Sequence, residues 1–151
     1  MKYIREALGK PSEGCIFCAK PKESNDRENL ILCRGVHAFV MLNAFPYNNG
    51  HCMVIPYLHT SSMDDIDAES ASELWRLLAK SRQALAKAFK PDGFNIGINL
   101  GRAAGAGIDQ HLHVHIVPRW NGDVNFMPAI GETKVISQSL EEAYDTLAGL
   151  F

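Results

Sequence analysis

The sequence predicts an α+β fold with a mostly antiparallel five-stranded sheet, one long helix and a C-terminal helix. Short stretches with strand-type patterns, one long stretch with helical periodicity and the order strands, helix, strands, helix lead to this prediction. The regular strand–helix alternation of parallel α/β proteins is missing. A length of 151 residues with 46% hydrophobic composition is enough for one core, so we expect a single domain over 1–151.

The first half of the chain carries three strand-type stretches. Residues 19–29 are polar and rich in turn formers, which predicts a surface loop. Residues 30–34 and 37–42 are rich in strand formers, and 51–56 resume the same pattern. Between them 43–50 (NAFPYNNG) contains proline, asparagine and glycine, which indicates an ordered turn. We therefore expect 37–56 to form a hairpin-like pair of strands.

The second half begins with the long helix. In 67–89, leucines and a phenylalanine recur at spacings of three, four and seven, with charged residues between them. Residues 94–100 and 111–117 alternate at period two, which is typical of strands. The loop 101–107 (GRAAGAG) between them is flexible enough to approach a ligand closely. Residues 136–150 predict a final amphipathic helix.

Composition narrows the class of partner and the compartment. The formal net charge is -2, so the chain lacks the basic field of a protein that binds long nucleic acids. No run of 18 apolar residues occurs and the first residues lack a secretory apolar region, so we expect no membrane and a cytoplasmic protein. Disulfides are rare in the cytoplasm. We expect Cys33 and Cys52, which lie in apolar stretches, to be buried thiols.

The segment His111-Leu112-His113-Val114-His115 carries the strongest functional signal. On a strand, alternate side chains share a face, so the three imidazoles are expected on one side and the apolar residues on the other. A random origin is a poor explanation for this spacing. A metal site is a rival interpretation, since imidazole is a common metal ligand. A solitary histidine such as His37 is more often structural.

The spacing also suits phosphoryl chemistry. A neutral imidazole nitrogen is a good nucleophile near pH 7, and the phosphoramidate that it forms is labile enough to be resolved by water or phosphate. A neighbouring histidine can donate to a phosphate oxygen or to the leaving group. Backbone amides of nearby glycines, with Gly105 and Gly107 as candidates, can hold the non-bridging oxygens.

The segment 111–117 (HLHVHIV) resembles the signature of the histidine-triad family at every position. Upstream, the pattern N-x-x-P-x-N-x-G-H at 43–51 and the pattern P-x-x-H at 56–59 also resemble this family. Residues 118–127 and 131–135 are similar to its bacterial branch of diadenosine-tetraphosphate phosphorylases or hydrolases. The resemblance extends from the C-x-x-C segment to the C-terminal helix and implies one histidine-triad domain with that segment packed onto it.

This resemblance implies a two-step mechanism on an adenosine nucleotide or dinucleoside polyphosphate. His113 would attack the α-phosphorus to form a nucleotidyl-histidine, and His115 would assist departure of the leaving group, with His111 as the third member of the triad. Water or phosphate would then release the nucleotide. Further substrate-binding residues implied by the resemblance are Asn43 at the ribose, Asn99 near the phosphates, and His51 on the same pocket wall.

The chain departs from the family pattern just before the triad. Many members have Gln-Ser or Gln-Thr there, whereas this chain reads GAGIDQ at 105–110. The difference resembles the phosphorylase branch and argues against a nucleoside-phosphoramidate hydrolase. The acceptor, water or phosphate, stays open. A nucleotide-binding signalling module without catalysis is the alternative from another functional class, and a zinc hydrolase acting through the triad is a third interpretation.

A second group of residues indicates a structural zinc site. Cys15 and Cys18 form a C-x-x-C pair that fits a metal, a redox pair or two reduced thiols. A tetrahedral zinc needs two further nitrogen or sulfur ligands, for which His59 and His111 are the best candidates. Zinc-containing members of the family use a comparable set. We expect no organic cofactor.

The remaining candidates have both a functional and a structural interpretation. Arg119 fits a distal phosphate and a surface ion pair equally well, and Trp120 fits packing at a dimer interface. The resemblance implies a homodimer, with 67–89 and neighbouring strand edges as contact surfaces. Three aromatic residues are candidates for an apolar slot around adenine: Phe39, Phe45 and Tyr47. Arg102 and Lys134 are expected to be solvated charges.

Overall fold

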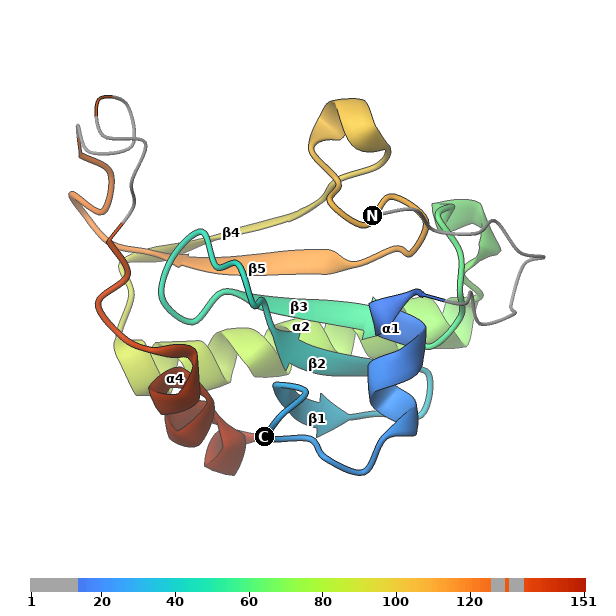
Figure 1. The fold of residues 1–151 in the computed structure, drawn as a ribbon, viewed down its shortest axis with the longest axis horizontal. Coiled ribbons are helices and arrows are strands. Elements are labelled where there is room, and N and C mark those ends of the chain that lie inside the picture. Colours follow the sequence, from blue (N-terminus) through green and yellow to red (C-terminus); the bar gives the residue numbers. More distant parts are fainter. Residues whose placement is uncertain (1–13, 126–129, 131–134) are drawn as a thin grey trace.

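A five-stranded antiparallel sheet with the strand order β1-β2-β3-β5-β4 forms the centre of the computed structural model (Figure 1). The structure describes residues 14–125, 130 and 135–151. The strands are β1 (Ile31–Arg34), β2 (Ala38–Leu42), β3 (Cys52–Pro56), β4 (Gly93–Ile98) and β5 (Val114–Arg119). Every neighbouring pair is antiparallel, which confirms the predicted α+β class and five-stranded sheet.

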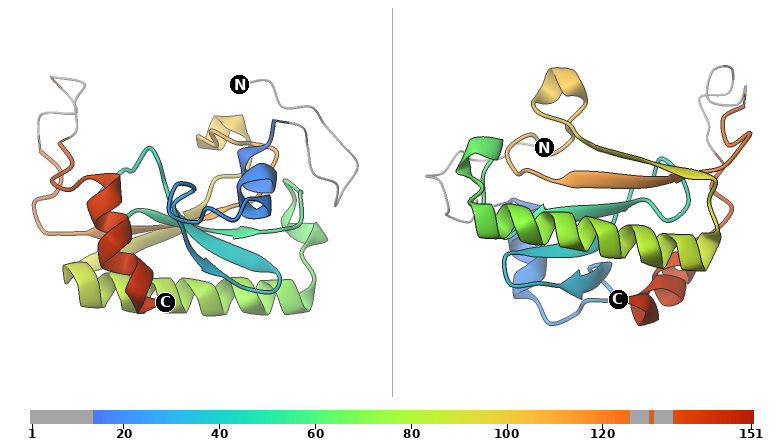
Figure 2. Two further views of the ribbon diagram at one scale, coloured as in Figure 1. Left: turned by 60° about the horizontal axis from the view of Figure 1, so that its bottom comes forward. Right: turned by 180° about the vertical axis from the view of Figure 1, so that it is seen from behind.

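The helices cover the sheet unequally. The long helix α2 (Ala68–Phe89) lies along one face, and the short helix α1 (Ile16–Ala19) lies on the opposite face over β2 and β3 (Figure 2). The C-terminal helix α4 (Leu140–Leu147) packs beside α2. Four short 3-10 helices complete the described elements: Lys20–Lys22, Met63–Asp65, Arg102–Ala104 and Ala148–Leu150.

Local sequence signals explain where α2 begins and ends. The Asp67 side chain accepts a hydrogen bond from the Ser70 backbone N–H at 2.8 Å and caps the first turn. At the other end, Lys90 adopts the left-handed conformation with φ 48°, directly before Pro91. Leu74, Leu78 and the other apolar residues of one face are buried against the sheet. The predicted helix over 67–89 is therefore confirmed.

The alternation of side chains in the strands divides the interior into two cores. In β2, Val40 packs on the α2 side, whereas Phe39 packs on the α1 side. In β5, Val114 and Ile116 also point toward α2. Because alternate residues face opposite sides, the intervening His115 lies on the α1 face. That face carries the site described below.

Some element boundaries differ from the sequence prediction. The strand expected over 111–117 begins three residues later, because Leu112 N–H bonds the Thr60 carbonyl at 2.6 Å instead of a neighbouring strand. The loop expected over 19–29 begins with the end of α1 and a 3-10 turn. The helix expected over 136–150 starts only after Ser139, which forms a capping box with Glu142.

Two smaller observations concern the remaining cysteines and the helices. Cys52 is buried in the central strand β3, but Cys33 is only partly buried, toward the end of the edge strand β1. Among the described residues, no helix has both the length and the apolarity that crossing a membrane requires.

Candidate active site

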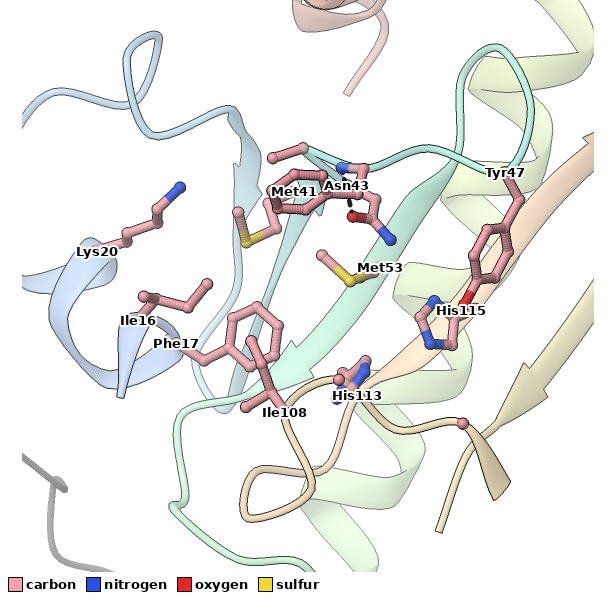
Figure 3. Close-up of a pocket in the computed structure, with 14 residues that line it drawn as sticks. Ile16, Phe17, Lys20, Met41, Asn43, Tyr47, Met53, Ile108, His113 and His115 are labelled. Carbon is pink, nitrogen blue, oxygen red and sulfur yellow. Dashed lines mark hydrogen bonds between the residues drawn. The ribbon is translucent and has the colours of Figure 1, made fainter. Parts of the chain in front are cut away.

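A pocket of about 270 Å³ opens on the α1 face of the sheet, with His113 and His115 on one side of it (Figure 3). Its wall is mostly apolar and is built by residues from α1, β2, β3 and two loops: Ile16, Phe17, Met41, Phe45, Met53 and Ile108. The volume is near the lower end for a small-molecule site. An apolar pocket with a few polar groups at one end suits a ligand with a flat base and a charged end.

The first of these polar groups is the ring of His113. Its Nδ1 lies 2.8 Å from the His111 carbonyl oxygen. Since a carbonyl can only accept, Nδ1 carries the proton and Nε2 of the neutral ring keeps its lone pair. Burial lowers the pKa of His113, against an opposing contribution from the His111 carbonyl. At neutral pH, His113 therefore has an unprotonated nitrogen in an apolar environment.

The second polar group, His115, has the opposite arrangement. The Tyr47 backbone N–H donates to His51 Nδ1 at 3.1 Å, so the proton of neutral His51 is on Nε2. His51 Nε2 lies 2.9 Å from His115 Nδ1 and donates to it. The remaining proton of His115 is consequently on Nε2. This chain of hydrogen bonds gives His115 an N–H donor where His113 has a lone pair.

Electrostatics supports the neutral state of both members of this chain. Burial, together with repulsion from His115 and His113, lowers the pKa of His51 to about 3. Burial and the neighbouring His113 lower the pKa of His115 to about 4. The His113 and His115 rings are 4.8 Å apart between centroids and nearly perpendicular. A ring with a free lone pair, His113, thus lies beside a ring with a free N–H, His115. Transfer of a group to a nucleophile needs such a lone pair, and release of the leaving group needs such a donor.

His51 itself does not lie on the pocket wall, contrary to the expectation from the resemblance. It is fully buried behind His115, and its ring contacts Tyr47 and His115. Both of its ring nitrogens bond within the protein, Nδ1 with the Tyr47 N–H of the 43–50 turn and Nε2 with His115 Nδ1, so neither is left for a ligand.

The expected binding residues are distributed around this pocket. Asn43 lines it, and its Oδ1 accepts the Phe45 N–H at 2.9 Å, which leaves the amide nitrogen over the cavity (Figure 3). Gly105 and Gly107 also line it. Gly105 has φ +89°, and a side chain at Gly107 would meet nothing within 4 Å. Asn99 is outside the lining, with its amide nitrogen 4.0 Å from where a Gly105 Cβ would be.

The aromatic candidates separate into two groups. Phe45 and Tyr47 line the pocket and are 85% and 53% exposed. Phe39 is buried and stacks on Tyr57 with 5.3 Å between centroids, so it does not line this slot. Phe17, which the sequence reasoning missed, packs on the His113 ring, with 5.1 Å between the ring centroids. The only available signal was its place between two cysteines, which drew attention to the thiols instead.

The four residues expected to bind metal form a buried cluster beneath the same wall. The possible ligand atoms of Cys15, Cys18, His59 and His111 all lie within 4.8 Å of one another. Cys18 Sγ is 3.3 Å from His59 Nδ1 and 3.5 Å from His111 Nδ1, and the two nitrogens are 3.2 Å apart. In a zinc tetrahedron, the standard bond lengths give about 3.5 Å between sulfur and nitrogen and about 3.3 Å between nitrogens.

The protonation states of the cluster residues also fit a bound zinc ion. His111 Nε2 donates to the Pro56 carbonyl at 2.8 Å, so Nδ1 is the unprotonated nitrogen that faces the sulfurs. Burial raises the pKa of the Cys15 thiol to about 11. A thiolate at this position therefore needs a cation beside it. His111 was also expected among the catalytic residues, but its ring lies in the cluster and is absent from the pocket wall.

The remaining candidates that the structure describes are absent from the pocket lining. Arg119 forms an ion pair with Asp123 at 2.7 Å, and Arg102 forms one with Asp109 at 2.8 Å. Trp120 is partly buried after β5. His37 Nε2 lies 3.8 Å from Glu69 Oε2. Lys134 falls outside the described residues.

Known proteins are similar to this chain in sequence and in fold. The pattern of the HIT domain family matches residues 25–122. The AP-4-A phosphorylase of Mycobacterium tuberculosis is 43% identical over 98% of this chain and 78% of its own length. The asymmetrical bis(5'-nucleosyl)-tetraphosphatase of Schizosaccharomyces pombe is 32% identical over 76% of this chain and 58% of its own. A zinc-bound histidine triad family protein from Mycobacterium smegmatis superimposes with a TM-score of 0.70 at 26% identity, over 91% and 93% of the two chains.

Proposed function

Because this chain belongs to the HIT domain family, we propose that its pocket cleaves diadenosine polyphosphates or related adenosine nucleotides through a covalent nucleotidyl-His113. One observation carries the proposal: the lone pair of His113 Nε2 and the N–H of His115 Nε2 lie side by side at the polar end of an apolar pocket. The apolar wall holds the adenine, and Asn43 has an amide free for the ribose.

In the first step, His113 Nε2 attacks the α-phosphorus and forms a P–N bond. The bond to the bridging oxygen breaks, and its electron pair leaves with the polyphosphate, to which His115 Nε2–H donates. Positive charge develops on the His113 ring, and the hydrogen bond from Nδ1 to the His111 carbonyl stabilises it. Gly105 and Gly107 line the pocket without side chains, so a phosphate can approach the loop backbone closely, while the Gly105 N–H itself bonds the Arg102 carbonyl at 2.9 Å.

In the second step, an acceptor oxygen attacks the same phosphorus and its proton passes to His115 Nε2, which restores the acid. The P–N bond breaks, with its electron pair returning to Nε2 of His113. We propose inorganic phosphate as the acceptor, which converts the bound AMP group into ADP. Two observations favour it over water. The pocket lining includes no carboxylate among the described residues, so no negative charge of the wall repels a phosphate dianion. The relative with 43% identity is named a phosphorylase.

We also propose that Cys15, Cys18, His59 and His111 bind a structural zinc. The distances, burial and tautomer of the cluster support this, as does the zinc-bound relative of known structure. When bound, zinc would stabilise two buried thiolates and hold the C-x-x-C segment against the histidine segment. A reducing cytoplasm would keep these thiols available, so we propose that compartment as well.

A homodimer is the proposed assembly. β4 is an edge strand of the sheet, and its Ile96 side chain is 51% exposed. An exposed edge strand is a template for pairing with a strand of another chain. Sedimentation of the purified chain tests this proposal, and a monomer at micromolar concentration would reject it.

Turnover of diadenosine tetraphosphate with and without inorganic phosphate tests the proposed reaction. With phosphate, the products should be ADP and ATP in equal amounts, and turnover should be slow without it. AMP and ATP in both conditions would identify water as the acceptor. Tight binding without any product would reject catalysis and favour the nucleotide-binding module.

A further inference from the structure

The loop 43–50 contains one polar side chain that is buried while its neighbours face solvent. Asn48 is 8% exposed, next to the exposed Tyr47. Its Nδ2 group donates one hydrogen bond to the Pro118 carbonyl at 3.0 Å and a second to Asp123 Oδ2 at 2.7 Å. Both amide hydrogens are therefore used. Asn48 ties the loop to the end of β5 and to the turn that follows.

Asp123, which accepts the second of these hydrogen bonds, is itself fixed by further hydrogen bonds. Arg119 donates to both of its carboxylate oxygens, at 2.7 and 2.8 Å, and the Trp120 N–H donates at 3.1 Å. Arg119 also donates to Asn95 of β4 at 2.6 Å. The hydrogen bond from Arg119 keeps the pKa of Asp123 below its usual range, so the acceptor stays anionic. The anchor of Asn48 is thus fixed to the strand that carries His115.

The loop that Asn48 anchors supplies the donor on which the His115 tautomer depends. The residue next to Asn48 is Tyr47, whose N–H bonds His51 Nδ1, and His51 in turn donates to His115 Nδ1. Without the Tyr47 donor, the His51–His115 hydrogen bond can form in the opposite direction, with His115 Nδ1 as donor. His115 would then face the pocket with a lone pair and could not assist a leaving group.

We propose that Asn48 is a positioning residue for the general acid: it holds the 43–50 loop so that the Tyr47 amide, through His51, keeps the proton of His115 on Nε2. The inference rests on the proposed function, because it assigns Asn48 to the step in which His115 assists the leaving group. It adds to the catalytic site a residue that touches neither substrate nor His115.

Esters of AMP with phenols of different acidity test this role. A dinitrophenolate leaves without help, whereas a phenolate needs a proton. We expect Asn48→Ala to slow kcat for the phenyl ester by about tenfold or more, and kcat for the 2,4-dinitrophenyl ester by less than about twofold. The adjacent Asn49→Ala is the matched control, since the Asn49 side chain donates to Gln138 at 2.9 Å and not to Pro118 or Asp123.

Each outcome has a distinct meaning. Equal slowing of both esters would overturn the proposal, because a merely structural role affects every substrate alike. Unchanged rates for both esters would overturn it too. If the wild-type enzyme forms no covalent nucleotidyl-histidine, the proposed function itself is rejected.

Histidine ¹⁵N spectra provide a test that needs no variant. In the wild-type protein, His51 and His115 should both show a protonated Nε2 and an unprotonated Nδ1. In Asn48→Ala, His115 should shift toward the Nδ1–H form, and in Asn49→Ala it should not. A wild-type His115 with its proton on Nδ1 would contradict the inference even if Asn48→Ala fails to fold.

Discussion

The metal-ligand cluster and the nucleotide pocket share one stretch of backbone, yet they use its histidines through different nitrogens. His111 donates from Nε2 to the Pro56 carbonyl and turns Nδ1 toward two sulfurs. His113, two residues later, donates from Nδ1 to the His111 carbonyl and keeps Nε2 free for the pocket. Both rings are buried and uncharged at neutral pH. The carbonyl that each ring meets therefore decides whether it suits a metal or a phosphorus atom.

This difference shows that residue type and burial do not define the role of a histidine. Three buried imidazoles lie in five residues, and their pKa values are all lowered mainly by burial. Their partners separate them: a carbonyl and thiols for His111, a carbonyl alone for His113, and a second imidazole for His115. The predictions below remove one side of this comparison at a time.

The largest expected effect comes from the pocket side. His113→Ala should lower turnover of diadenosine tetraphosphate on the order of 10⁴-fold or more, because no other lone pair faces the phosphorus. Binding of AMP, measured by calorimetry, should change little. His37→Ala, outside the pocket, is the control. Retained activity in the His113 variant would refute the mechanism.

The matching change on the cluster side should affect stability. Cys18→Ser removes the sulfur that contacts both His59 and His111 and should abolish zinc binding. We expect the free energy of unfolding, measured with urea, to fall by roughly 3 kcal/mol or more, because metal affinity adds to folding stability. Cys33→Ser, outside the cluster, is the control. A Cys18 variant with one zinc per chain and unchanged stability would disprove the ligand set.

A smaller effect should appear on acidification. The folded-state pKa values of His51 and His115, about 3 and about 4, lie below the ordinary value of 6.5. Between about pH 6.5 and 4 the unfolded chain therefore binds more protons, so stability falls as the pH falls. His51→Gln should reduce the difference in unfolding free energy between pH 7 and 5 by roughly 1–2 kcal/mol. An unchanged difference would mean that His51 is not held neutral.

The smallest effect should connect the two regions. Ile16 and Phe17 line the pocket and lie between the cysteines of the cluster. Removal of zinc by a chelator should therefore weaken AMP binding about fivefold, and by linkage AMP should strengthen the equilibrium affinity for zinc by the same factor. Phe17→Ala should weaken AMP binding with zinc retained. Identical AMP affinity with and without zinc would show that the wall stands without the metal.

The sequence predicted the boundaries of elements that depend on residues nearby in the sequence. The helix over 67–89 was predictable because its cap, its leucine spacing and its terminal Lys90-Pro91 all lie within the segment. The beginning of β5 was not, because it depends on Thr60, whose carbonyl takes the Leu112 N–H away from the sheet. Pattern alone could not reveal that partner.

The site shows the same division. The triad and the four cluster residues could be predicted, since each carries chemistry in its residue type. Asn48 and Phe17 could not, because their importance comes from contacts across the fold: Asn48 bonds Asp123, 75 positions away, and Phe17 packs on His113. His51 was assigned to the pocket but serves behind it, a distinction that depends on one backbone amide of the 43–50 turn.

Trapping the nucleotidyl intermediate tests the different use of the two nitrogens most directly. Diadenosine tetraphosphate labelled at the α-phosphorus, mixed with enzyme in the absence of phosphate and quenched in alkali, should leave one AMP group on His113, located by peptide fragmentation. No label should appear on His111 or His115, because neither has a lone pair toward the pocket. Label on His115, or none on an enzyme that turns over, would contradict the assignment of His113 as the nucleophile.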